Sequence, residues 1–247
     1  MLLDAEMGAG QRIERRFTLY VDDRLVLLGT DDRGRDLLFR LLATMKFTIV
    51  PGSIAVVISV VFGTLIGAYG GFYGGWARAL LAGASTVIQS VPGLLLIFLA
   101  AVISVFNIYL VMVVVGVILI PETANGVLER VEALRKRDFV EAARELGMRD
   151  RTILWKEIVW HNARGFLVTR ITQGFVFAIL IDVTLSYMGL ANLNSTRLGT
   201  MLLEGRTAVL GGQSTALALA PLSALLVAIV SFSLLERGVL GFWERRR

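Results

Sequence analysis

Ionisable side chains inside long apolar runs are the first residues of this sequence that could do chemistry. Asp182 and Arg170 both fall within the apolar run 166–190. Charge is costly inside a bilayer, so such a residue is a functional candidate by default, and Asp182 could line a path through a membrane, together with Gln173 and Ser186. The alternatives are a carboxylate hydrogen-bonded within a helix bundle for Asp182 and an amide that holds helices together for Gln173. Arg170, near the end of the run, can extend its guanidinium towards the membrane surface.

The other reactive residue types give little support to catalysis. The sequence has no cysteine, which excludes disulfides and thiolate chemistry, and His161 is its only histidine. We interpret Gln89 and Asn107 as amides that hold helices together, and the pairs Asp22-Asp23 and Asp31-Asp32 as a solvated face. We therefore predict no catalytic residue, no metal site and no enzymatic activity.

The segment 138–164 contains the strongest local signal for an interaction with another protein. Apolar residues recur there at three- and four-residue spacing, which predicts one face of a short amphipathic helix: Phe139, Ala142, Ala143 and Leu146. Gly147 follows, where a residue with access to the left-handed conformation ends a helix at little cost, and a second helix is predicted over Arg151–Val159. Small alanines suit close packing into a groove of another protein, whereas an amphipathic helix could equally lie on lipid headgroups.

The elements that position these residues are predicted to cross a membrane. Hydrophobic residues make up 55% of the 247 residues and the mean hydropathy is +0.70, against roughly 45–50% apolar residues in an ordinary soluble domain. A helix needs about 20 apolar residues to cross the hydrocarbon core. Five spans are predicted, namely one at 47–69, two within 79–121 with a kink at Pro92-Gly93 and a break near Phe106-Asn107, one at 166–190 and one within 207–235.

This pattern predicts an all-α membrane protein in three parts. These are a polar extracytoplasmic segment 1–46, a transmembrane domain 47–240 and a basic tail 241–247. The tail is assigned to the cytoplasm because basic residues collect there, which also makes the large polar loop 122–165 cytoplasmic. Eight Lys and Arg on the outer segment 1–46 conflict with this rule. Either longer polar segments escape it or a first span precedes Met1.

Four segments of the chain carry a family resemblance. They are Glu141-Ala142-Ala143 with Gly147 and Ile158, LGTDDRGRD at 28–36, LSYMGL at 185–190 and GTMLLEGR at 199–206. They resemble, respectively, the EAA motif, the G-T-D-x-x-G-R-D segment, the L-S-F-L-G-L segment and the G-x-M-L-x-E-G-R segment of ABC importer permeases of the oligopeptide, dipeptide and nickel type. The chain departs from the family after Ile158, where Val159 to Asn162 stand in place of the usual Leu-Pro-Asn.

The resemblance implies a type I ABC importer transmembrane domain, the second permease subunit of a transporter in the bacterial inner membrane. Such permeases usually have six spans, which favours the interpretation that a span precedes Met1.

The EAA motif would couple ATPase motion to transport: Glu141 would cap or anchor the coupling helix, Ala142 and Ala143 would permit close approach, and Gly147 would set the turn. The implied partners are a homologous permease, two ATPase subunits and an extracytoplasmic solute-binding protein. The chain contains no G-x-x-x-x-G-K-[ST] loop, so ATP would be bound by the ATPase partners and no cofactor by this chain.

Two other classes of function are alternatives to an ABC permease. An ATP-independent secondary transporter or channel would be favoured by inverted repeats or by charged pairs in several spans. A membrane enzyme would need clustered His, Asp or Glu at one depth, and only Asp182 qualifies. We therefore predict an ABC permease for peptides or similar small solutes.

Overall fold

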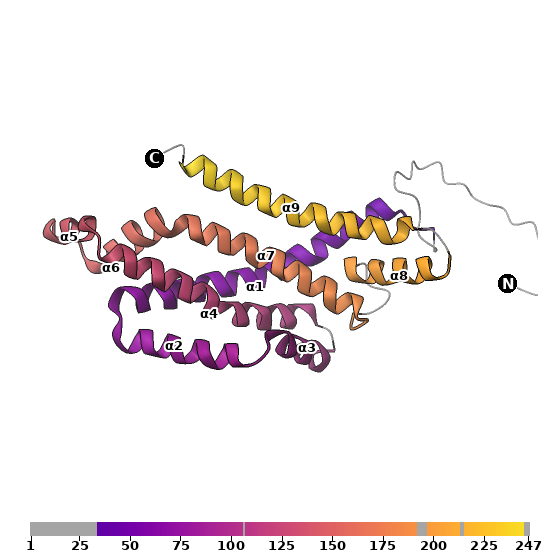
Figure 1. Cartoon of the computed structure of the whole chain (residues 1–247), viewed down its shortest axis with the longest axis horizontal. Helices are drawn as coiled ribbons and strands as arrows, with labels where there is room; N and C mark the ends of the chain where they lie inside the picture. Colours follow the sequence, from indigo (N-terminus) through magenta and orange to yellow (C-terminus); the bar gives the residue numbers. More distant parts are fainter. Residues whose placement is uncertain (1–33, 106, 192–196, 213–214, 245–247) are drawn as a thin grey trace, which may run out of the picture.

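The computed structural model describes residues 34–105, 107–191, 197–212 and 215–244. The chain forms an elongated bundle of roughly aligned helices (Figure 1). In chain order the elements are α1 (Leu37–Tyr73), α2 (Gly75–Ser90), α3 (Gly93–Ile103), α4 (Ile108–Arg135), α5 (Asp138–Glu145), α6 (Asp150–Thr152), the π-helix η1 (Ile153–Ala163), α7 (Arg164–Tyr187), α8 (Leu198–Leu210) and α9 (Ala216–Glu244). The short helices α5 and α6 lie at one end of the bundle, and α8 lies at the other (Figure 1).

The predicted number of spans agrees with these helices. Four helical stretches are long and apolar enough to cross a membrane, and the pair α2–α3 adds a fifth span if it counts as one. The two helices of that pair meet at 71°, and the break lies at Pro92, as the kink prediction required. The predicted break near Asn107 is also present, because Asn107 caps α4 by accepting a hydrogen bond from the Tyr109 amide at 3.1 Å. Phe106 lies outside the described residues.

The first and last spans differ from their predicted limits. Helix α1 begins at Leu37 rather than at residue 47, because the Asp36 side chain caps it and accepts from the Leu38 amide at 2.8 Å. The charges of Arg40 and Lys46, which had suggested a polar segment, are therefore part of a helix. The predicted last span 207–235 combined parts of two helices: α8 ends at Leu210 and α9 begins at Ala216. The prediction followed the absence of charged residues and did not use the turn signal Gly211-Gly212.

Glycines allow α1 and α4 to pack closely along their length. Three of them, Gly63, Gly67 and Gly71, recur every four residues on the α1 face that meets α4. A Cβ at Gly63 would lie 2.7 Å from Thr123 Cβ, and one at Gly71 would lie 2.6 Å from the Leu128 carbonyl oxygen. Small residues at this spacing let helix backbones approach each other in a membrane. The α1–α4 pair thus forms the centre of the bundle and supports α5 at its end.

Candidate functional site

The predicted coupling helix is present as α5, and its end has the predicted geometry. Gly147 has φ +76°, the left-handed conformation that favours glycine. Its amide donates to the Arg144 carbonyl at 2.9 Å, and the Met148 amide donates to the Ala143 carbonyl at 3.0 Å. These two bonds form a Schellman motif, which satisfies the last carbonyls of the helix. Gly147 therefore ends α5 and reverses the chain, as the sequence predicted.

The inward face of α5 differs from the predicted one. Val140 is fully buried and Ala143 is 7% exposed, and both pack into one apolar cluster with residues of α1, α4 and η1. Of the two alanines predicted to be on the surface, only Ala142 is exposed. Leu146, which the spacing had placed on the same face as Ala143, is 82% exposed. The predicted pattern left out Val140, and four residues on so short a helix did not separate its buried side from its exposed side.

Glu141 is exposed in the first turn of α5, where a carboxylate is favoured by the partial positive charge of the helix N-terminus. It lines a cavity of about 500 Å³ at the end of α1, α2 and α4. The basic residues Arg135 and Lys136 line the same cavity. The position is compatible with the predicted anchoring role of Glu141.

The second predicted helix has an unusual form. Residues Ile153–Ala163 form a π-helix that continues directly into α7. The side chains of His161 and Asn162 bond to carbonyls five residues earlier, those of Lys156 and Glu157, at 2.5 and 2.7 Å. Ile158 is fully buried in the same cluster as Val140. It therefore attaches the α5 region to the bundle and has no surface with which to contact a partner.

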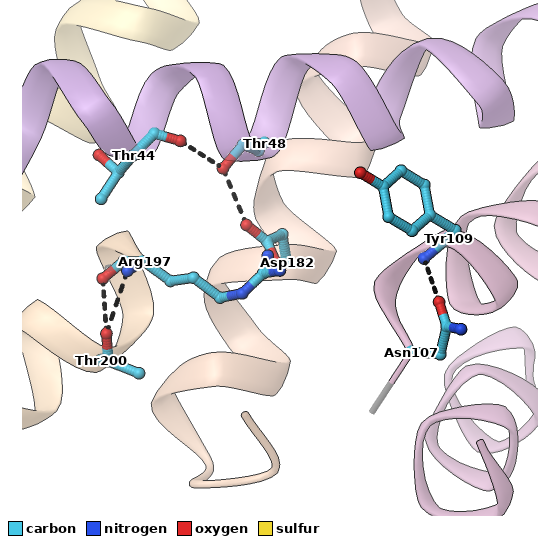
Figure 2. A network of polar contacts seen from close by, with 7 residues as sticks. All are labelled: Thr44, Thr48, Asn107, Tyr109, Asp182, Arg197 and Thr200. Carbon is cyan, nitrogen blue, oxygen red and sulfur yellow. Dashed lines mark hydrogen bonds and ion pairs between the residues drawn. The ribbon is translucent and has the colours of Figure 1, made fainter. Parts of the chain in front are cut away.

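Asp182 is fully buried and lies between three elements. One carboxylate oxygen accepts from Thr48 of α1 at 2.8 Å, and the other pairs with Arg197, the residue before α8, at 2.6 Å (Figure 2). The Thr48 hydroxyl also lies 3.2 Å from the Thr44 carbonyl, and the Arg197 amide donates to the Thr200 hydroxyl at 3.2 Å. With 0% of its surface exposed, Asp182 fits the alternative of a carboxylate that is hydrogen-bonded within the helix bundle. Sequence reasoning missed Arg197, although it is the only charged residue in the stretch 191–203.

Ser186 is also fully buried, one turn further along α7. It lies against α8, since a Cβ built on Gly199 would be 2.5 Å from Ser186 Cβ. Two of the family-like segments therefore meet here. The segment 185–190 contains Ser186 and Gly189, which has φ +80°, and the segment that begins at Gly199 packs onto it. These segments join α7 to α8, and Ser186 has no exposed surface on which to meet a solute.

Gln173 is the one predicted path residue that lies on an open cavity. The cavity has a volume of about 610 Å³ and lies between α1, α2, α4 and α7. Residues from all four helices line it: Ser59, Gln89, Ile118, Leu119, Pro121, Glu122, Thr123, Arg170, Gln173, Gly174 and Phe177. Arg170, which is predicted to extend towards the membrane surface, has two side-chain partners here. Its Nη1 pairs with Glu122 at 2.8 Å and donates to the Gln173 side-chain oxygen at 2.9 Å.

Comparisons with known proteins place this arrangement among transport proteins. The family model described as "Binding-protein-dependent transport system inner membrane component" matches residues 59–240. The glutathione transport system permease protein GsiD of Salmonella typhimurium is 34% identical over 212 residues, which is 85% of this chain and 69% of that protein. The proteins of the same name from Shigella flexneri and Pectobacterium atrosepticum are 32% and 28% identical, covering 85% and 86% of this chain and 69% and 70% of their own lengths. The family match includes α5, η1 and most of the α1–α4 interface.

Proposed function

We propose that this chain, which belongs to the family of binding-protein-dependent transport system inner membrane components, carries short peptides or similar small solutes. As a member of that family it is the permease subunit of an ABC importer in the bacterial inner membrane. It is not an enzyme, and the ATP that drives transport is used by partner ATPase subunits. The observation that carries the choice of solute is the 34% identity to permeases whose name assigns them glutathione, itself a tripeptide.

The assembly that we propose contains this chain, a homologous second permease, two ATPase subunits and an extracytoplasmic binding protein. The family membership supports the ATPase and binding-protein partners. Large exposed apolar side chains along α1 and α4, such as Val57, Val61 and Val113, provide surface that a second permease could cover. This chain would then form one half of the pore.

The contact with the ATPases is assigned to α5. Its outward residues Glu141, Ala142 and Leu146 are exposed, whereas Ala143 and Ile158 hold it to the bundle and Gly147 ends it. A rigid attachment is what mechanical coupling needs, because motion applied to α5 passes into η1 and α7 through packed side chains. The cavity that contains Gln173 is assigned to the solute path, since Asp182 and Ser186 have no exposed surface.

The solute assignment is tested by reconstitution. The chain is co-purified with its partner subunits, reconstituted in proteoliposomes with the binding protein, and assayed for uptake of radiolabelled glutathione and trialanine. We expect uptake of at least one peptide that depends on ATP and on the binding protein. ATP-driven uptake of a different solute class, with neither peptide carried, would contradict the peptide assignment.

The docking assignment is tested by Leu146→Asp. The substitution puts a charge on a side chain that is 82% exposed, so folding of the chain is expected to be unaffected, while an apolar contact with the ATPase is lost. We expect at least about a tenfold loss of ATPase recovered with the purified permease, corresponding to roughly 1.4 kcal/mol of binding free energy. Leu210→Asp serves as a control, because this leucine is 75% exposed in α8, at the opposite end of the bundle from α5. Unchanged ATPase recovery in Leu146→Asp would exclude α5 as the main contact.

A further inference from the structure

Glu122 is a carboxylate with a largely exposed side chain inside a helix that is long and apolar enough to cross a membrane. It is the fifteenth residue of α4, about 21 Å along the helix at 1.5 Å per residue, after a run from Ile108 to Pro121 without any charge. Its side chain is 65% exposed. A charged group at this depth that faced lipid would cost on the order of 3 kcal/mol. The face of α4 that carries Glu122 therefore faces water or another polar surface.

Arg170 approaches Glu122 from α7, and its guanidinium has unused capacity. The side chain is only 11% exposed. Both of its hydrogen bonds, to Glu122 and to Gln173, use Nη1, and its Nε is buried without a hydrogen-bond partner among the described residues. A guanidinium has five N–H donors in a fixed planar arrangement that matches a carboxylate with two parallel bonds. The single contact with Glu122 leaves this preferred mode of binding unfilled.

A second arginine–carboxylate pair on α7 shows what a purely structural pair looks like in this protein. Asp182 is 0% exposed and its partner Arg197 is 13% exposed, and Thr48 fills the second carboxylate oxygen. The Glu122–Arg170 pair instead opens onto the cavity of about 610 Å³, together with the exposed amides of Gln89 and Gln173. That volume lies within the range of roughly 300–1,000 Å³ found for small-molecule sites.

We propose that this cavity is a charge-selective binding subsite of the solute path. In it, Arg170 releases the Glu122 carboxylate and binds the carboxylate of the passing solute instead. The proposal rests on the proposed function as a solute permease. The released Glu122 carboxylate then accepts a cationic group of the same solute, so the subsite selects solutes that carry both a carboxylate and an ammonium group. Ile118, Leu119 and Phe177 provide the apolar part of the wall. Because one ion pair replaces another, no unpaired charge is left at membrane depth during the exchange.

Because the sequence contains no cysteine, a single cysteine introduced into the cavity can test the proposal. Gln89→Cys puts a thiol in the cavity without removing a hydrogen-bond partner of Arg170. Its rate of modification in the reconstituted complex is measured with anionic sulfonatoethyl and cationic trimethylammonioethyl methanethiosulfonate, each divided by the rate with a free thiol. We expect the Arg170→Gln background to lower the anionic-to-cationic ratio by up to about a hundredfold, because a unit charge roughly 12 Å away at an effective dielectric constant near 20 changes each of the two rates about tenfold, in opposite directions. Arg170→Lys, which keeps the charge, should retain most of the ratio, and Glu122→Gln should raise it.

Protection by a peptide tests solute recognition directly. Millimolar trialanine should slow modification of Gln89→Cys several-fold, its C-terminal amide should not, and Arg170→Gln should abolish the difference. A ratio that is unaffected by Arg170→Gln, or equal protection by the acid and the amide, would overturn the subsite. ATP-driven uptake by the Gln89→Cys complex is measured in parallel. If uptake is normal but the anionic-to-cationic ratio does not respond to Arg170→Gln, the subsite is wrong and the permease function stands. If no peptide uptake occurs, the proposed solute class itself fails.

Discussion

Two arginine–carboxylate pairs use side chains of α7, and their surroundings assign them different roles. The Glu122–Arg170 pair faces a cavity, whereas the Asp182–Arg197 pair is sealed within the bundle, with Thr48 as a further partner. A buried pair is hard to exchange, because each charge would lose an ionic partner in a site of low dielectric constant. Asp182 is therefore expected to matter for stability, by joining α1, α7 and α8.

Asp182→Asn is predicted to destabilise the chain strongly. The change leaves the Arg197 guanidinium buried opposite a neutral amide, and loss of one partner of a buried pair costs about 3–5 kcal/mol. The midpoint of thermal unfolding of the purified complex in detergent should fall accordingly. Asp182→Leu combined with Arg197→Met should recover part of the loss, since no unpaired charge then remains. Wild-type stability combined with lost transport in Asp182→Asn would favour the path-lining role instead.

At the scale of elements, the close contact of α1 with α4 depends on glycines. A Cβ at Gly67 would collide with the Ala124 carbonyl oxygen, whereas one at Gly83 of α2 would meet nothing within 4 Å. We predict that Gly67→Ala destabilises the chain by about 1–3 kcal/mol, because a tightly packed interface must separate to admit the methyl group. Thermal unfolding in detergent measures the effect, and Gly83→Ala is the matched control. Equal midpoints for the two variants would show that the α1–α4 contact is looser than described.

The end of α5 gives a second prediction at this scale. Gly147 has φ +76° and open space around it, so Gly147→Leu is opposed by backbone strain of about 1–2 kcal/mol and not by a clash. The strain should move the end of α5 and uncouple ATP hydrolysis from uptake, with insertion in the membrane unchanged. Gly147→Asn, which tolerates the left-handed conformation better, should retain most of the uptake. Normal uptake per ATP hydrolysed by Gly147→Leu would refute the coupling assignment.

Features of this fold that are set by neighbouring residues can be predicted from the sequence, whereas features set by contacts between distant residues cannot. Charge-free runs of 20 or more residues located the spans, and Gly147 located the end of α5, because both signals are local. The inward face of α5 and the partners of Asp182 depend on contacts between segments distant in the chain. Thr48 lies 134 residues from Asp182, and no local pattern indicates that pairing. Arg170 is predicted to extend to the membrane surface from its place near the end of an apolar run, and no local pattern indicates its partner Glu122, 48 residues away.

At the scale of the whole molecule, the two ends of the bundle are expected to lie on opposite sides of the membrane. The helix α5 marks one end and α8 the other (Figure 1), and α7 is the single crossing between them. The basic residues around α5 assign that end to the cytoplasm, in keeping with a contact to ATPases. The helix α8 is then expected to lie outside, where an extracytoplasmic binding protein would dock.

This orientation predicts the labelling of two single-cysteine variants with a membrane-impermeant maleimide. Leu146→Cys and Leu210→Cys replace side chains that are 82% and 75% exposed at the two ends. Leu146→Cys should react only in inside-out vesicles and Leu210→Cys only in right-side-out vesicles, because one apolar crossing of about 30 Å separates them. Val230→Cys, exposed in the middle of α9, should remain unlabelled in both because it faces lipid. Reaction of both end positions from the same side would contradict the crossing by α7. Reaction of each position from the opposite side to that expected would show an inverted orientation, in which α5 could not contact the ATPases.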